Sequence, residues 1–416
     1  MDRVNTNAAA GPDAYVPLPR VLRWFWAGSA ATLVLTLVVA WLEWHAGWPK
    51  GRWDPVQYPL FTDLVEYVPT FRLVHTPEFF HPAYSAVAYP PFGAAIFGAI
   101  YTGGHPVVVY LVIAALVLSY AVWAVRGALL RRRVRPMTAL LFPLTLVLAS
   151  FPLWRLVPQG NIELFLWMFV VAGIWAYLRG QDEAAAVLWA LAAAMKLYPI
   201  IFLVLFVPRW KWRALAAGVA TFVVATVASL AYLGPSIAVA ARGSLTDVFG
   251  YQGVRVQEWT IRELAGNHSF FTLVKFVAIV AGVSTEALTK PYYVCGALLF
   301  AVVFFGRVRK LPVANQLLFV SLFMVMLPPV SYFHTLLHLY APWLLLAFVA
   351  VRAAKDGVRV PGLGAVMLLM LPLFSSFTLY TFPTLMIYAG LIQAALLGVL
   401  LICVAVFPFE ENRATA

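Results

Sequence analysis

One carboxylate in the first long polar stretch has the surroundings of a general base. Asp63 lies in residues 61–67 (FTDLVEY), with apolar sequence on both sides. Tyr67 follows it by four residues, so on a helix the two side chains would share a face. A carboxylate held near an apolar surface can take a proton from a hydroxyl group that arrives there. The simpler interpretation is that Asp63 caps a short helix, as aspartates often do.

Lysine, amides and a tyrosine lie in short turns between later apolar segments. The turns are Gln159-Gly160-Asn161 and Lys196-Leu197-Tyr198-Pro199. Lys196 interrupts an apolar sequence, and two interpretations stay open for it. It is either a lysine whose stem lies in lipid and whose amine reaches the membrane surface, or a compact cation that contacts a lipid-linked phosphate.

Two histidines mark a later turn, where His334 and His338 follow Ser331. Their spacing of four would suit a shared metal, but no third ligand is close in sequence, so a metal site is not favoured. A hydrogen bond to a sugar or a phosphate fits better. The alternative is that both are buried histidines with a structural role.

The composition defines the class of protein. The chain has 416 residues, of which 63% are hydrophobic and 11% charged, and its mean hydropathy is +0.87. These values exclude a soluble globular protein and predict an all-α polytopic membrane protein. Much of the net charge of +12 lies in short turns, so it does not indicate nucleic-acid binding. Cys295 and Cys403 lie in apolar runs and predict neither a disulfide nor a metal site.

Charge predicts the topology. Basic turns such as 131–135 and 307–310 belong in the cytoplasm by the positive-inside rule. We expect a cytoplasmic tail (1–19) and one transmembrane domain (20–416) of about twelve helices, with both termini in the cytoplasm. Its expected parts are a first outer loop (45–104), spans two to seven (105–233), a second outer loop (234–289) and C-terminal spans (290–416). Residues 91–101 and 270–283 are expected as interfacial helices in the two outer loops.

Several motifs resemble those of a known family. In chain order they are Asp63-Leu64-Val65-Glu66-Tyr67, Tyr89-Pro90-Pro91-Phe92, Gln159-Gly160-Asn161 and Lys196-Leu197-Tyr198-Pro199, with weaker matches at Asn267-His268-Ser269 and at residues 328–334. The chain resembles the polyprenol-phosphate-sugar-dependent glycosyltransferases of the membrane-embedded GT-C superfamily. More narrowly, it resembles glycosyltransferase family 87, the family of mycobacterial alpha-1,2-mannosyltransferases that act on phosphatidylinositol mannosides.

The resemblance implies a GT-C-type bundle of about a dozen helices with a catalytic aspartate, Asp63, in the first outer loop. It also implies a lipid-linked sugar donor and inversion at the anomeric carbon. Two departures concern the acceptor. Pro69 follows Asp63 where these enzymes usually continue a helix, and His334 and His338 are less tightly arranged than is common in the family. The phosphatidylinositol mannoside acceptor is therefore not transferred to this chain.

The predicted activity is transfer of a hexose, with mannose favoured, from a polyprenyl-phosphate-linked donor to a hydroxyl of a lipid-linked or glycan acceptor, with Asp63 as general base. The predicted contacts to the donor phosphate are Lys196, Arg255, Arg262 and His334. The predicted contacts to sugar or acceptor are Tyr67, Tyr89, Gln159, Asn161, Tyr198, Asn267, His268, Ser331 and His338. No cofactor and no metal are expected, because fixed cations can neutralise a monophosphate.

The expected location is a bacterial inner membrane, with the active site on the extracytoplasmic side and membrane lipids around the chain. The alternative function is a multi-pass transporter or flippase for an anionic lipid or solute. A transporter needs polar groups near the bilayer midplane, whereas here they cluster at the outer ends of spans. No internal repeat is evident in the sequence, which also disfavours an inverted-repeat transporter.

Overall fold

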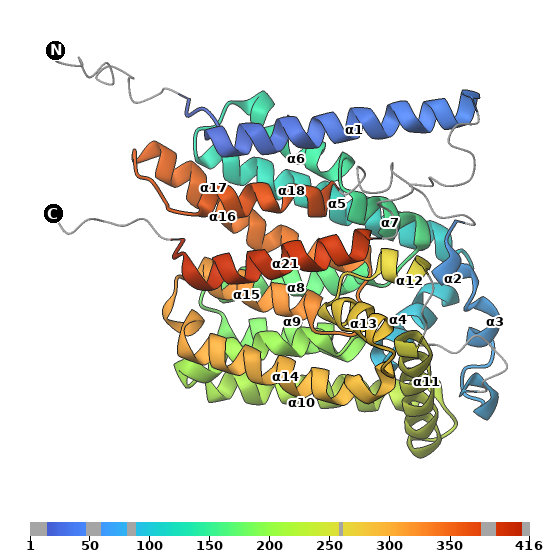
Figure 1. Cartoon of the computed structure of the whole chain (residues 1–416). Coiled ribbons are helices and arrows are strands. Elements are labelled where there is room, and N and C mark those ends of the chain that lie inside the picture. Colours follow the sequence, from blue (N-terminus) through green and yellow to red (C-terminus); the bar gives the residue numbers. More distant parts are fainter. Residues whose placement is uncertain (1–14, 47–59, 81–88, 258–260, 376–387, 410–416) are drawn as a thin grey trace, which may run out of the picture.

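The computed structural model is a bundle of helices (Figure 1). It describes residues 15–46, 60–80, 89–257, 261–375 and 388–409. Within these ranges the only extended pairing is one isolated bridge between Asn267 and Tyr332. The prediction of an all-α polytopic membrane protein is confirmed.

Six helical segments among the described residues are long and apolar enough to cross a membrane. They are Arg20–Val39, Pro106–Arg131, Trp212–Leu233, Thr285–Lys310, Phe333–Lys355 and Ala389–Val406. A seventh candidate is the pair α6 (Pro136–Leu148) and α7 (Phe151–Gln159), which is bent by 60°. The predicted count of about twelve spans is not confirmed by this criterion. The other apolar helices are shorter: α4 (Pro91–Thr102), α8 (Glu163–Leu178), η2 (Tyr198–Arg209), α13 (Phe270–Ala281), α15 (Val313–Met326) and the pair α17 (Leu363–Leu369) and α18 (Leu371–Phe374).

The long helices include α1 (Arg20–Ala46), α5 (Pro106–Arg131), α10 (Trp212–Leu233), α14 (Thr285–Gly306), α16 (Tyr340–Lys355) and α21 (Ala389–Val406). Several of them present large apolar side chains outward, among them Leu116, Trp123, Val224 and Val302. Such a surface is stable against lipid and not against water.

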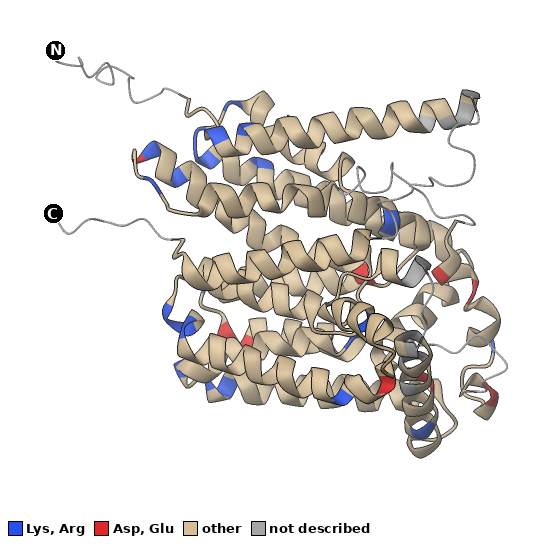
Figure 2. Ribbon diagram, viewed as in Figure 1, with Lys and Arg blue, Asp and Glu red and all other residues tan. Residues whose placement is uncertain are grey.

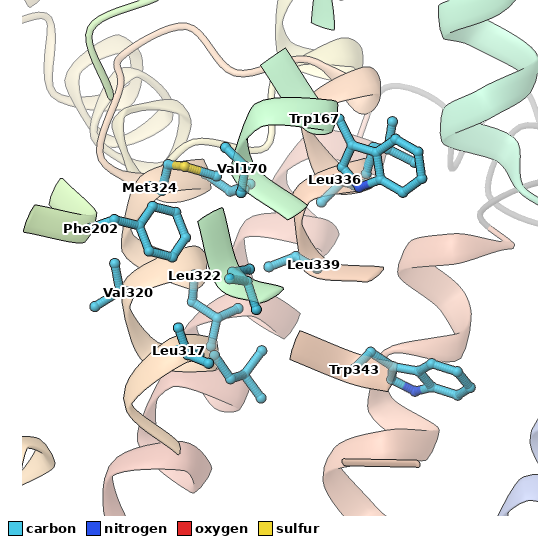
Figure 3. Packing of buried hydrophobic residues seen from close by; sticks show 14 of the residues in the cluster. Trp167, Val170, Phe202, Leu317, Val320, Leu322, Met324, Leu336, Leu339 and Trp343 are labelled. Carbon is cyan, nitrogen blue, oxygen red and sulfur yellow. The ribbon is translucent and has the colours of Figure 1, made fainter. Parts of the chain in front are cut away.

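The shorter helices form the interior. In α15 every side chain from residue 315 to residue 326 is buried. Figure 3 shows how this helix meets its neighbours, with Phe202 of η2, Val170 of α8, Leu322 of α15 and Leu339 of η4 (Phe333–Leu339) in one apolar cluster. This packing holds α8, η2 and η4 against α15.

Two elements cross the bundle in unusual ways. α9 (Asp182–Met195) buries mostly alanines and packs against both α8 and α10, because small side chains let helices approach closely. η2 is a 3-10 helix of 12 residues. At a rise of about 2.0 Å per residue it reaches about 24 Å, farther than the roughly 18 Å of an α-helix with the same number of residues.

The second predicted outer loop, residues 234–289, is largely helical. It contains α11 (Ile237–Gln257), α12 (Ile261–Gly266), α13 and the start of α14. Sequence analysis predicted only one interfacial helix there, at residues 270–283, and this prediction corresponds to α13. α11 was not predicted because its three glycines and its charged residues, among them Arg242 and Asp247, are more typical of a loop than of a helix interior.

The two ends of the bundle differ in charge. Lys and Arg gather at the end where α1 begins and α21 ends (Figure 2). At the opposite end lie the short helices α2 (Thr62–Val65) and α3 (Val68–Phe71), together with α4, α11 and α12 (Figure 1). Asp63 in α2 and Asn161, which is bonded to it, belong to this second end.

Candidate active site

Asp63 lies in α2, a single helical turn. The residue before this turn, Phe61, has a left-handed backbone (φ 58°), and its N–H donates to Pro158 O at 2.5 Å. Tyr101 of α4 donates its hydroxyl to Leu64 O on the other side. The helix ends at Val65, and a new turn starts at Val68, so Asp63 and Tyr67 do not share one continuous helix as the sequence spacing predicted. Pro69 stands in the first turn of α3, a position that tolerates proline.

A glycine lets the turn after α7 meet the Asp63 helix. Gly160 has φ +69°, a conformation that favours glycine. A Cβ atom there would also lie 2.6 Å from Leu64 Cγ, which is too close for any real contact. Both the turn and the contact with α2 therefore require glycine at this position.

Asn161 connects Asp63 to the start of α8. Its Nδ2 donates to Asp63 Oδ2 at 2.6 Å, and its Oδ1 accepts from the Glu163 N–H at 2.9 Å. Because a backbone N–H can only donate, the amide orientation is determined by the second bond. Tyr110 of α5 donates its hydroxyl to the Asn161 backbone carbonyl at 3.2 Å, which ties this turn to α5. Asn161 thus orients the Asp63 carboxylate from a fixed helix terminus.

Burial raises the pKa of Asp63 to about 6, while the nearby Lys196 ammonium and the hydrogen bond from Asn161 oppose that rise. A carboxylate with this pKa is ionised near neutral pH, and it holds a proton more strongly than an ordinary aspartate does. Both properties suit a general base.

A second carboxylate, absent from the sequence-based site, lies at the centre of the polar cluster. Glu163 is fully buried at the start of α8. Its Oε1 accepts from Lys196 Nζ at 2.5 Å and from the Tyr198 hydroxyl, and its Oε2 accepts from His338 Nε2 at 2.9 Å. Lys196 therefore has a specific partner and is not an isolated snorkelling charge. The signal for Glu163 was present in the sequence, because an acidic residue opening an apolar helix is costly and tends to be functional.

One aromatic ring, that of Tyr89 just before α4, lies over Lys196. Lys196 Nζ lies 5.3 Å from the centroid of the Tyr89 ring, a cation–π distance. Tyr89 in turn contacts Tyr67 edge to face, with centroids 6.1 Å apart. Gly93 in α4 allows this arrangement, since a Cβ there would lie 2.9 Å from Met195 O at the end of α9. Of the predicted sugar contacts, Tyr89 thus lies beside Lys196, and Tyr67 packs against Tyr89.

Asn267, His268 and Ser331 form a separate buried network. Asn267 Oδ1 accepts from the N–H groups of Ser269 and Ser331, both at 3.0 Å, and Asn267 Nδ2 donates to Pro329 O at 2.9 Å. His268 Nε2 lies 3.1 Å from Ser331 Oγ and 3.1 Å from Thr335 Oγ1. This network joins the segment before α13 to the turn that leads into η4.

The polar atoms of this network are largely used within the protein, so sugar contact by these three residues stays a prediction without geometric support. Burial lowers the pKa of His268 to about 3, so this imidazole is neutral near pH 7. The network has a clear structural effect, because it fixes the start of the helix that carries His334 and His338.

Of the remaining predicted residues, the structure describes the side chains of some and not of others. His334 is buried and close enough to interact electrostatically with Lys196, Glu163 and His338. Gln159 is half-buried at the end of α7, next to Gly160. The side chains of Arg255 and Arg262 lie outside the described part of the structure. Within the described ranges no three His, Cys, Asp or Glu residues form a potential metal-ligand set.

Comparisons with known proteins place the chain in a family. The family model of glycosyltransferase family 87 matches residues 88–331, which is more than half of the chain. The match includes Asn161, Glu163, Lys196 and Tyr198, and it begins after Asp63 and ends before His334. Searches of curated proteins and of solved structures found no match.

Proposed function

The chain belongs to glycosyltransferase family 87 and is a membrane glycosyltransferase, and from this premise we propose that it transfers a hexose, with mannose as the first candidate, from a polyprenyl-phosphate donor. The acceptor is a hydroxyl of a lipid-linked or glycan molecule. The observation that carries the proposal is that one turn holds both a base and a cation: Asn161 donates to Asp63, and Glu163, two residues later, accepts from Lys196. The base can act on the acceptor hydroxyl, and the cation can stabilise the leaving phosphate.

Asp63 acts on the acceptor. As the acceptor oxygen attacks the anomeric carbon, its proton passes to the Asp63 carboxylate and the bond between that carbon and the phosphate oxygen breaks. The electron pair of the broken bond stays with the phosphate. Attack from the face opposite the leaving group inverts the anomeric centre. An aspartate of pKa about 6 can accept the proton because bond formation acidifies the hydroxyl during the step.

Lys196 acts on the donor. The leaving polyprenyl phosphate gains negative charge, and an ammonium next to it stabilises that charge. The Lys196 side chain is 19% exposed, whereas its partner Glu163 is fully buried. A phosphate can therefore reach the exposed part of Lys196 but not Glu163. The Tyr89 ring beside Lys196, and the Tyr67 ring packed against it, offer flat apolar faces to a sugar.

The sidedness is inferred from the charge distribution. Most basic residues lie at the end of the bundle opposite Asp63 (Figure 2). We place that basic end in the cytoplasm with both chain termini, and the active site on the extracytoplasmic side of a bacterial inner membrane. This orientation suits a lipid-linked donor, because the sugar then reaches the site within the membrane and not as a soluble nucleotide sugar.

The test is a transfer assay. The purified full-length protein is incubated with radiolabelled polyprenyl-phosphate-mannose and total membrane lipids, and the products are separated and identified by mass spectrometry. The expected result is a new glycosylated lipid or glycan that contains one added hexose. Polyprenyl-phosphate-glucose in a parallel reaction reports the choice of sugar. Transport of the intact donor without any new glycosidic bond would contradict the proposal.

A further inference from the structure

Glu163 connects the turn that holds Asp63 with the segment that carries Lys196 and Tyr198. The sequence predicted no role for it. We propose that Glu163 is a positioning residue that fixes Lys196 and Tyr198 for the donor phosphate and keeps the charged product from binding too tightly. This inference deepens the proposed function and rests on it for the identity of the phosphate.

The geometry shows why one carboxylate can position several groups. Lys196 stands at the end of α9, Tyr198 at the start of η2, and His338 in η4. All three donate to the Glu163 carboxylate, which is fully buried at the first turn of α8. With three donors on two oxygens, the carboxylate has its charge satisfied and its rotamer fixed. The three donors consequently keep their places relative to Asp63.

The main chain and the side chain of Glu163 serve different partners. Its backbone N–H holds Asn161 Oδ1 and thereby the orientation of Asp63. Its side chain holds Lys196. A change from Glu to Gln alters the second function and leaves the first intact, which makes the role of the side chain separable by experiment.

The charge of Glu163 also affects the donor phosphate. Lys196 alone would attract both the donor and the product strongly, since both carry a phosphate. Glu163, 2.5 Å from Lys196 Nζ, offsets the ammonium in the resting site. Because the leaving phosphate gains charge during transfer, Lys196 helps the transition state more than the ground state, while the carboxylate weakens product retention.

A purely structural ion pair is the competing explanation. Buried pairs often add little net stability, and removing one partner leaves an uncompensated charge. Such a pair would change the melting temperature on mutation without changing the balance between phosphate binding and turnover. The experiment therefore needs a kinetic and a chemical readout.

The main variant is Glu163→Gln, which keeps the size and the acceptor oxygen of the side chain. Its matched control is Glu183→Gln, which removes the same charge from an exposed pair with Arg213. Each purified protein is assayed for kcat, for KM of the donor and for binding of polyprenyl phosphate. The rate at which acetic anhydride acetylates Lys196 at fixed pH is followed by mass spectrometry.

For Glu163→Gln we expect kcat to fall at least about tenfold and polyprenyl phosphate to bind at least about threefold more tightly. Lys196 should react faster because its ion pair is lost. The control should match the wild type in all readouts. Unchanged kcat, or phosphate binding that is weaker than in the wild type, would overturn the inference.

A second variant covers the case in which Glu163→Gln does not fold. Tyr198→Phe removes one donor and no charge. It should lower kcat severalfold while phosphate affinity stays the same, whereas equal kcat would contradict positioning through Glu163. Phosphate binding and acetylation need no transfer, so they report on Glu163 even if no acceptor is glycosylated. Failure of transfer in the wild type would count against the proposed function alone.

Discussion

At the scale of single residues, Asp63 combines two environments that usually exclude each other. It is buried enough for its pKa to rise to about 6, yet it faces an ammonium and an amide donor that favour its charged form. A residue selected only to cap a helix would gain nothing from this arrangement, because the cap bonds of α2 involve no side chain. The surroundings therefore favour the base over the cap.

The variant Asp63→Asn separates the base from the cap. Asparagine keeps the size and accepts from Asn161 but cannot accept the proton, so turnover should fall about a hundredfold or more with donor binding nearly unchanged. Asparagine caps helices as well as aspartate does, so a capping residue would lose almost nothing. Transfer rate and donor affinity, measured on one preparation, decide between the two. Near-normal turnover would rule out the mechanism.

The same carboxylate predicts a pH dependence. Asp63 must be ionised to act as a base, so kcat should fall as the pH decreases through about 6. The folded pKa exceeds the ordinary value of 3.8, so ionised Asp63 costs stability above pH 6. Asp63→Asn should then raise Tm at pH 8, and the gain should shrink between pH 6 and 4. A flat rate profile between pH 5 and 8 would contradict this assignment.

Lys196→Ala tests the cation. We expect use of the lipid-phosphate donor to weaken at least about tenfold, or about 1.4 kcal/mol of transition-state stabilisation. Lys196→Arg should be only partly tolerated, because the guanidinium differs in shape and hydration. The control is Lys211→Ala, since Lys211 forms an ion pair with Asp182 at the basic end, with N and O atoms 3.0 Å apart.

Loss of Lys196 also leaves Glu163 buried without its ammonium, which lowers stability. The double variant Glu163→Gln/Lys196→Met removes both charges and should regain stability without regaining activity. Activity in the double variant would show that the lysine serves the fold and not the phosphate.

At the scale of elements, sequence patterns predicted the features that depend on apolar length and missed those that depend on packing. α4 and α13 begin and end within two residues of the predicted segments 91–101 and 270–283, because each is one apolar run between polar turns. The break in residues 61–71 was not predicted. It depends on the left-handed backbone of Phe61 and on its contact with Pro158, which lies far away in the sequence.

The candidate site shows the same division. Sequence order suggested Asp63, Asn161, Lys196, Tyr198 and His338, and the structure brings these residues into one connected set. The sequence marks Glu163 as an unusual acidic residue at the start of an apolar helix, but it does not show which residues Glu163 connects, because they come from different elements. Asn267 and Ser331 looked equally promising, but the Asn267 amide bonds to Pro329 O and the Ser331 N–H, and the Ser331 hydroxyl bonds to His268 and Thr335.

Gly160→Ala tests the contact between the two turns that carry Asp63 and Asn161. The change combines the cost of φ +69° for alanine, about 1–3 kcal/mol, with a clash against Leu64. Gly357 is a matched control, because it has φ +68° and no atom within 4 Å of an added Cβ. Both variants should lose stability, but only Gly160→Ala should also lose transfer activity per folded molecule. Equal activity in both would show that the contact with α2 does not position Asp63.

At the scale of the whole molecule, one end of the bundle is basic and the other holds the site (Figures 1 and 2). The 14 residues of α9 separate Gln181 from Lys196. At about 1.5 Å per residue this is about 21 Å, most of the thickness of a hydrocarbon core. This length fits the orientation proposed above, in which the two ends face different sides of the membrane and the basic end lies in the cytoplasm.

Cysteine labelling tests this orientation in intact cells. In a background with Cys295 and Cys403 replaced by serine, single cysteines are placed at four exposed positions: Glu66 and His105 near the site, and Gln181 and Arg309 at the basic end. A membrane-impermeant maleimide should label positions 66 and 105 in intact spheroplasts, and positions 181 and 309 only after permeabilisation. The opposite pattern would place the site in the cytoplasm and contradict the proposed extracytoplasmic active site. Asp63 and Tyr110 of α5 both bond to Asn161, so positions 66 and 105 should be labelled from the same side. Labelling of the two positions from different sides would contradict the arrangement of the site.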